Sequence, residues 1–143
     1  MMKKVNAILI FNPSATHILM CLRTKNPYKG LYNLVGGKVE AGESDFDAAY
    51  RELEEETGIT KTAVILTHLM DFDYHLDAIE LQIYVGKLNK LVDLTEESQS
   101  LHWMNVNENF FDMTKFAGKG NIGHVLALVK TSDIWEMLIN ASV

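Results

Sequence analysis

Cysteine, long apolar runs and an N-terminal targeting segment are scarce or missing in this sequence. The single cysteine, Cys21, excludes a disulfide within the chain and is typical of a protein from a reducing compartment. Residues 1–4 include two lysines and lead into an apolar run only as long as a β-strand. Such a start indicates neither a signal peptide nor a transmembrane helix. We therefore expect a cytoplasmic protein with no membrane partner.

Basic residues are also scarce relative to acidic ones. The chain has 13 Lys and Arg against 19 Asp and Glu, a net charge of −6. Residues 40–56 contain eight acidic side chains and one basic side chain, a local charge of −7, so the rest of the chain sums to about +1. Because there is no basic stripe, we do not expect binding along a nucleic-acid backbone or at an anionic membrane surface.

The size and composition are those of one globular domain. The 143 residues are 48% hydrophobic and 22% charged, and a chain of this length buries about two-thirds of its unfolded surface. It contains no internal repeat, low-complexity tract or linker. Residues 1–143 are therefore expected to form a single domain.

Apolar and β-branched runs predict five strands, over residues 5–11, 17–23, 62–74, 79–88 and 101–106. Further elements are a helical turn over 107–113 and a C-terminal helix over 122–138, either continuous or broken near 131–132. Together with a central helix, described next, this order predicts an α/β protein in which helices cover both faces of a mixed sheet.

The acidic segment has the signals of a helix with defined ends. Ser44 is a good N-cap, and Gly58 supplies the left-handed residue that commonly ends a helix. These signals predict a helix over residues 45–57. Within it, Phe46, Ala49 and Leu53 recur at helical spacing and predict the buried face.

The other face of this helix concentrates negative charge. Glu52, Glu55 and Glu56 lie at i, i+3 and i+4, near the negative end of the helix dipole. Each unfavourable contact costs roughly 0.3–1 kcal/mol unless a cation binds. Convergent carboxylates are what a hard divalent cation such as Mg²⁺ requires. The alternative is an acidic helix face in contact only with solvent.

The spacing of these residues resembles the Nudix box at every defined position. The matching residues are Gly37, Glu43, Arg51, Glu52, Leu53, Glu55, Glu56, Gly58 and Ile59. The resemblance implies a Nudix-type α/β/α sandwich, with the box as a loop–helix–loop on one side of the mixed sheet and a C-terminal helix. It also implies hydrolysis of a nucleoside diphosphate linked to another moiety, with Mg²⁺ or Mn²⁺ as cofactor.

The resemblance further implies a role for each box residue. The expected metal ligands are Glu52, Glu55, Glu56 and the carbonyl of Gly36. Arg51 is expected to hold the carboxylates by ion pairing, and it lies at i, i+4 to Glu55. Structural roles are expected for Gly37, Glu43 and Gly58. Most family members have a proline where Val35 stands, so the chain entering the box is expected to be less constrained here.

The general base is left open between two places. Some members of the family use a box glutamate. Others use a glutamate in a later loop, and Glu97, six residues before Trp103, lies in a comparable loop. The alternative for Glu97 is a solvated charge in a connector.

Three residues outside the metal site are expected to bind the substrate: Arg23, Lys38 and Asn121. Arg23 follows the second strand, where it reaches either a substrate phosphate or solvent. Asn121 lies in a glycine-rich loop, where its amide either pairs with a purine edge or caps the C-terminal helix.

The substrate class follows from features outside the box. Signatures of the coenzyme A and NADH groups are missing, as is the proline that marks many ADP-ribose hydrolases. A nucleoside triphosphate is then the expected substrate, for example an oxidised purine such as 8-oxo-dGTP. The alternatives are ADP-ribose, or a dinucleoside polyphosphate because Tyr74 lies where hydrolases of that group carry a tyrosine. A different class is a nucleotide-sensing module without activity. We expect a monomer or homodimer.

Overall fold

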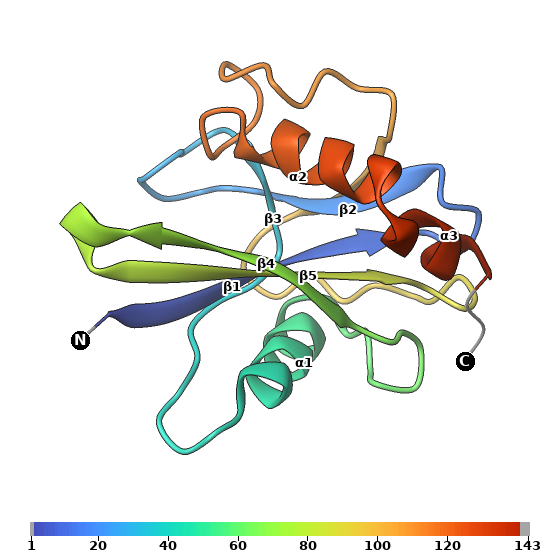
Figure 1. The fold of residues 1–143 in the computed structure, drawn as a ribbon, viewed down its shortest axis with the longest axis horizontal. Helices are drawn as coiled ribbons and strands as arrows, with labels where there is room; N and C mark the ends of the chain where they lie inside the picture. Colours follow the sequence, from blue (N-terminus) through green and yellow to red (C-terminus); the bar gives the residue numbers. More distant parts are fainter. Residues whose placement is uncertain (1, 141–143) are drawn as a thin grey trace.

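The computed structural model describes residues 2–140. A six-stranded mixed sheet lies between helix α1 on one face and helices α2 and α3 on the other (Figure 1). The strands are β1 (Lys3–Phe11), β2 (His17–Leu22), β3 (Tyr32–Leu34), β4 (Thr67–Tyr74), β5 (Ile79–Lys87) and β6 (Leu101–Asn105). The helices are α1 (Asp45–Thr57), α2 (Asn121–Thr131) and α3 (Asp133–Asn140), with a short 3₁₀ turn at His75–Asp77. The predicted fold class is confirmed.

The strand order is β3-β2-β1-β5-β4, and β6 pairs with β2. Strands β1 and β5 are parallel in register over their full length, from Lys3 opposite Ile79 to Phe11 opposite Lys87, whereas the other pairs are antiparallel. Strands β1 and β2 meet only at Phe11 and Ile18. The rest of that edge of β1 is not paired with β2. Residues 35–39, which follow β3, pair with it instead.

The consecutive apolar residues of β1 point alternately into two cores, as expected for a strand covered on both faces. Ile8 and Ile10 pack on the α1 side, while Leu9 and Phe11 pack on the side of α2 and α3. Trp135 of α3 closes the second core, with its ring 5.6 Å from that of Phe11 in an edge-to-face contact. The sheet is thus fixed from both sides around β1.

Two expectations about the elements need correction. The strand predicted over residues 62–74 begins only at Thr67, because residues 62–66 form a loop that buries Ala63, Val64 and Leu66 in the core on the α1 side. The helical turn predicted over 107–113 is a series of turns instead, stabilised by side-chain acceptors such as Asn109, which binds the Phe111 N–H at 3.2 Å. Of the two alternatives for the C-terminal helix, the broken one is confirmed, because Ser132 is in an extended conformation between α2 and α3.

Figure 1 shows how the helices leave one part of the sheet open. Helices α2 and α3 cover one end of the upper face, and the β4–β5 hairpin and the start of β1 extend beyond them. Among residues 2–140, no helix has the length and apolar character needed to cross a membrane.

Candidate functional site

Helix α1 has the predicted bounds, and its caps explain them. The Ser44 side chain accepts a hydrogen bond from the Asp47 N–H at 3.1 Å. At the other end Gly58 is left-handed (φ 80°) and donates its N–H to the Glu54 carbonyl.

The buried face of α1 agrees with the prediction for Ala49 and Leu53 but not for Phe46. The Phe46 side chain is 43% exposed, and its ring contacts that of Tyr84. Ala48 and Thr57 are buried instead.

The glycine pair lies close against both β1 and α1. Gly36 has a φ of 152°, and a Cβ there would overlap the Asn6 carbonyl. A Cβ on Gly37 would overlap the carboxylate of Glu52. Gly36 therefore needs glycine because backbone approaches it closely, whereas a side chain at Gly37 would displace the Glu52 carboxylate. The result is that Glu52 is held directly beside the loop.

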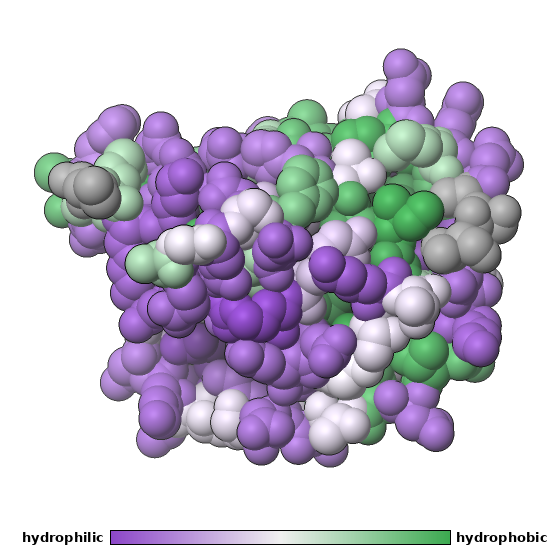
Figure 2. Space-filling model, turned by 90° about the horizontal axis from the view of Figure 1, so that it is seen from below, coloured by the Kyte–Doolittle hydropathy of each residue, from purple (hydrophilic) through white to green (hydrophobic). Residues whose placement is uncertain are grey.

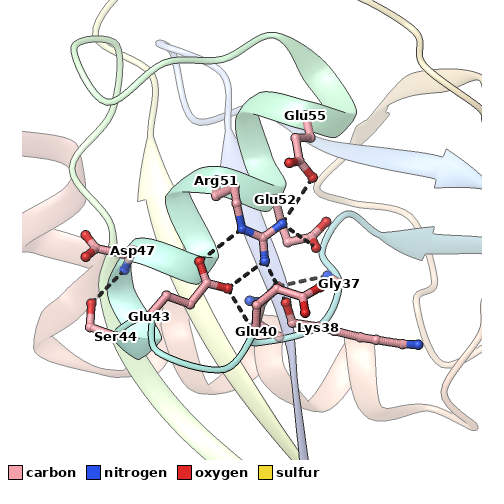
Figure 3. A network of polar contacts seen from close by, with 10 residues as sticks. Gly37, Lys38, Glu40, Glu43, Ser44, Asp47, Arg51, Glu52 and Glu55 are labelled. Atoms are coloured by element: carbon pink, nitrogen blue, oxygen red, sulfur yellow. Dashed lines mark hydrogen bonds and ion pairs between the residues drawn. The ribbon is translucent and has the colours of Figure 1, made fainter.

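A network of ion pairs centred on Arg51 connects the loop to the helix (Figure 3). Arg51 binds Glu43 through two nitrogens, Nε to Oε2 at 3.0 Å and Nη2 to Oε1 at 2.7 Å. Its Nη1 donates to Glu52 at 3.0 Å and to Glu55 at 3.1 Å. Its Nη2 also donates to the Lys38 carbonyl at 2.8 Å. The expected contact between Arg51 and Glu55 is thus present, and one guanidinium orients three carboxylates.

Glu43 is the strongest partner in this network. The pair with Arg51 has the parallel two-bond geometry that gives charge-assisted bonds their strength and direction. Glu43 Oε1 also accepts the Glu40 N–H at 2.7 Å, which closes the loop before the helix. The hydrogen bonds from Arg51 and then from the Glu40 backbone lower the pKa of Glu43 to about 2. Glu43 therefore stays ionised and fixes both Arg51 and the loop.

Glu56 lies in a different environment from the other box glutamates. Burial of its carboxyl raises the pKa of Glu56 from the ordinary 4.5 to about 7. A backbone hydrogen bond from Gly36 and the charge of Arg23 lower this pKa, whereas the charges of Glu52 and Glu55 raise it. The structure thus brings Arg23 and Gly36, from two separate segments, to the same carboxyl group.

A small cavity of about 10 Å³, roughly the room for one water molecule, opens beside Glu56. Its lining residues are Cys21, Glu56, Glu97, Ser98, Gln99 and Leu101. The loop that carries Glu97 is anchored to the end of α1, because the Thr95 N–H donates to the Thr57 carbonyl at 2.8 Å. The neighbouring Glu96 accepts the Leu101 N–H at 2.8 Å. Of these two adjacent glutamates, only Glu97 lines the cavity.

The predicted metal ligands are the carboxylates of Glu52, Glu55 and Glu56 and the carbonyl of Gly36. These oxygen donors are of the kind that a hard divalent cation binds. Their arrangement is not yet that of a metal site. Within residues 2–140, no three carboxylate, imidazole or thiol groups are placed to hold a metal ion together. Glu52 and Glu55 both face Arg51, while Glu56 is bonded to Gly36. A cation held by all three glutamates would therefore require side-chain rotations on α1. Figure 2, which views the molecule from the α1 side, shows a largely hydrophilic face.

The three residues predicted to bind substrate have different neighbours. Arg23 donates its Nε to the Pro27 carbonyl at 3.2 Å and lies near Glu56. The Lys38 side chain extends away from the Arg51 network (Figure 3). Asn121 does not cap α2, because the N-cap is Gly120 and no side chain provides the cap. Its Nδ2 instead donates to the Tyr74 hydroxyl at 2.6 Å.

Two residues of this region were missed by the sequence analysis. Asn6 binds the glycine loop, and its only sequence signal is a polar residue within an apolar strand. Tyr28 lies close enough to Tyr74 to contribute to raising its pKa, after burial. Neither residue belongs to the box, and both contacts join segments far apart in the sequence.

Comparisons with known proteins agree with the fold and the box. A family profile described as NUDIX domain matches residues 2–124. An ADP-ribose pyrophosphatase of Methanocaldococcus jannaschii is 50% identical over 42 residues, which are 29% of this chain and 25% of that protein. The match therefore spans about a quarter of that relative's length.

Solved structures match over most of the chain. The C. elegans Ap4A hydrolase in a binary complex has a TM-score of 0.71 at 20% identity, covering 88% of this chain and 95% of that one. A MutT structure, from work on Aliivibrio salmonicida and Vibrio cholerae, has a TM-score of 0.63 at 26% identity, covering 90% and 99%. The NUDIX domain of Shewanella oneidensis NrtR, complexed with ADP ribose, has a TM-score of 0.70 at 16% identity, covering 92% and 90%.

Proposed function

Because the chain belongs to the NUDIX domain family, whose profile matches residues 2–124, we propose that it is a metal-dependent pyrophosphohydrolase. It would cleave the phosphoanhydride of a nucleoside diphosphate linked to another moiety. The observation that carries this proposal is the network in which Arg51 orients three carboxylates beside the half-buried Glu56. We further propose that residues 1–143 act as one domain in the cytoplasm.

The proposed metal ligands are the Glu52, Glu55 and Glu56 carboxylates and the Gly36 carbonyl, with Mg²⁺ or Mn²⁺ as the cation. A divalent cation bound there supplies charge neutralisation for the diphosphate oxygens and activation of a water molecule. Arg51 holds the carboxylates in orientation. Glu43, in turn, holds Arg51, and the absence of side chains at Gly37 and Gly58 lets Glu52 and the Thr95 loop pack closely.

Glu97 is the proposed general base. It lines the cavity with Glu56, and its loop is anchored to the end of α1. In the reaction, a water oxygen forms a bond to phosphorus, its proton passes to the base, and the bond from phosphorus to the bridging oxygen breaks. A glutamate of α1 is the competing base, and Glu56 is the first candidate because it lines the same cavity as Glu97.

A nucleoside triphosphate, such as an oxidised purine nucleotide, is the proposed substrate. Arg23, near the carboxylates, and Lys38, on the glycine loop, are proposed to bind its phosphates. The test is a hydrolysis screen with Mg²⁺ over nucleoside triphosphates, oxidised nucleotides, ADP-ribose and dinucleoside polyphosphates, with product analysis. Nucleoside monophosphate and pyrophosphate from a triphosphate support the proposal. Faster cleavage of another class of compound in the screen would change the proposed substrate but not the proposed type of reaction.

A dinucleoside polyphosphate is the second candidate substrate. It is favoured by the Tyr74–Asn121 hydrogen bond, which places an aromatic ring and an amide together at the open part of the sheet. Tyr28 lies near the same hydroxyl. The similar structures of an Ap4A hydrolase and of an ADP-ribose complex are consistent with an adenine nucleotide at such a surface.

We predict that Asn121→Ala changes nucleotide preference and lowers stability only by the loss of its exposed hydrogen bond to Tyr74. Asn121 is not the helix cap, so the usual cost of losing a cap does not arise. Loss of a hydrogen bond to the base should reduce discrimination among purine nucleotides by roughly 1–3 kcal/mol. The measurements are kcat/KM for a panel of nucleotides and the melting temperature. Tyr74→Phe keeps the ring and removes the hydroxyl that holds Asn121, so a smaller change in the same direction is expected. An unchanged ranking in Asn121→Ala would remove this residue from the substrate site.

The non-enzymatic alternative is a module that senses nucleotides without cleaving them. The NrtR domain is a similar structure solved with ADP ribose. Binding of a nucleotide with no Mg²⁺- or Mn²⁺-dependent turnover of any compound in the screen would favour this alternative. The intact set of box carboxylates supports the enzyme instead.

A further inference from the structure

Asn6 interrupts the apolar run of β1. It lies on the α1 side of the sheet, as Ile8 and Ile10 do, and is only 5% exposed. Its register partner on β5 is Gln82, which is 3% exposed. A pair of buried amides at this depth is unusual for a core, because each buried polar group needs its own hydrogen-bond partners.

The two amides differ in how well they are satisfied. Gln82 donates to the Asp45 and Glu80 carboxylates, both at 3.0 Å, and accepts from the Tyr84 hydroxyl at 3.3 Å. Asn6 Nδ2 has no partner, and within residues 2–140 it is the only buried side-chain donor or acceptor in that state. The amide of Gln82 thus has three partners that stabilise it, whereas one end of the Asn6 amide opposes folding.

The satisfied end of Asn6 is directed at the glycine loop. Asn6 Oδ1 accepts the Gly37 N–H at 2.9 Å, and the Asn6 N–H donates to the Gly37 carbonyl at 2.7 Å. Both polar groups of the Gly37 backbone are therefore held by this one residue. The Glu52 carboxylate lies against Gly37, so the position of Asn6 also bears on Glu52.

We propose that Asn6 is a positioning residue for the cation site. Its side chain fixes the Gly36–Gly37 backbone, and this holds in place the Gly36 carbonyl and the side of the loop against which the Glu52 carboxylate lies. An apolar side chain would fill this space without an unpaired donor, but only an acceptor at this position can bind the Gly37 N–H. The inference rests on the proposed function, because it concerns the cation that function requires.

The experiment measures Mn²⁺ affinity by electron paramagnetic resonance without nucleotide, on the full chain. The variants are Asn6→Leu, Asn6→Asp and, as the matched control, Gln82→Leu. Asn6→Leu removes the acceptor, and we expect Mn²⁺ affinity to fall by about tenfold, the lower end of the usual effect of residues that orient metal ligands. Asn6→Asp keeps the acceptor and should bind Mn²⁺ at least as tightly as the wild type. Gln82→Leu loses three hydrogen bonds away from the loop, so its melting temperature should fall while its Mn²⁺ affinity stays within twofold.

Turnover gives a second readout of the same comparison. In Asn6→Leu the Mg²⁺ concentration for half-maximal activity should rise in parallel with the loss of Mn²⁺ affinity, with KM for the nucleotide within about twofold. Wild-type Mn²⁺ affinity in Asn6→Leu, or an equal loss in Gln82→Leu, would overturn the inference. If Asn6→Leu does not fold, Asn6→Ala gives the same comparison. Failure of the wild type itself to bind Mn²⁺ would instead refute the proposed function.

Discussion

Replacing Glu55 and Glu56 together by Gln is expected to lower metal-dependent hydrolysis by more than about 10³-fold. The change keeps the shape of both side chains and removes two of the three charges proposed to bind the cation, an interaction worth several kcal/mol. Metal affinity and kcat should fall together. The matched control is Glu54→Gln, an exposed glutamate of the same helix that is not among the proposed ligands, which should retain activity. Normal turnover in the double variant would contradict the metal site.

The same double variant should be no less stable than the wild type without metal, and the difference should depend on pH. The pKa of Glu56 is raised from 4.5 to about 7 in the folded protein. Below pH 4.5 the group is protonated in both the folded and the unfolded state, so it has no effect. As the pH rises toward 7 it ionises first in the unfolded state, which destabilises the folded wild type. The measurement is the melting temperature of both metal-free proteins between pH 4 and pH 8. We expect the melting temperature of the wild type to fall relative to that of the variant as the pH rises.

The second large effect concerns Glu97→Gln. If Glu97 is the general base, kcat should fall by roughly 10²–10⁴-fold, the usual contribution of general-base catalysis. Metal affinity should change little, because Glu97 is not among the proposed ligands. Steady-state kinetics and Mn²⁺ binding measure the two quantities separately.

The matched control for Glu97 is Glu96→Gln. Glu96 is the adjacent residue of the same loop, and its role is to accept the Leu101 N–H, which Gln can also do. It should therefore keep kcat near that of the wild type. A loss of less than about threefold in Glu97→Gln would assign the base to the α1 helix, with Glu56 the first choice because it lines the same cavity.

Local signals in the sequence were sufficient to predict where helix α1 begins and where it ends. The bounds of α1 follow from Ser44 and Gly58, whose contacts are with residues three or four positions away. The fold class follows from the order of strands and helices, and the residue spacing identifies the box. These features do not depend on which distant segments meet.

Contacts between distant segments could not be predicted in the same way. The Asn121–Tyr74 bond joins residues 47 positions apart, and the Gly37–Asn6 bond joins residues 31 apart. Strand β3 has only three residues, too few for an alternating pattern, and forms because β2 offers it an edge. Phe46 has helical spacing typical of the core, yet it is 43% exposed and only its ring contacts that of Tyr84. In each case the tertiary arrangement, rather than the local pattern, decides the outcome.

The most direct test of the metal-dependent reaction at α1 is a Mg²⁺ titration of hydrolysis, starting from protein stripped with a chelator. The best substrate of the screen would be used, with wild type and the Glu55→Gln, Glu56→Gln double variant in parallel. The account predicts no turnover without added cation, saturable recovery with Mg²⁺ or Mn²⁺ in the wild type, and no recovery at the same concentrations in the variant. Hydrolysis by the stripped wild type, or equal recovery in both proteins, would contradict it.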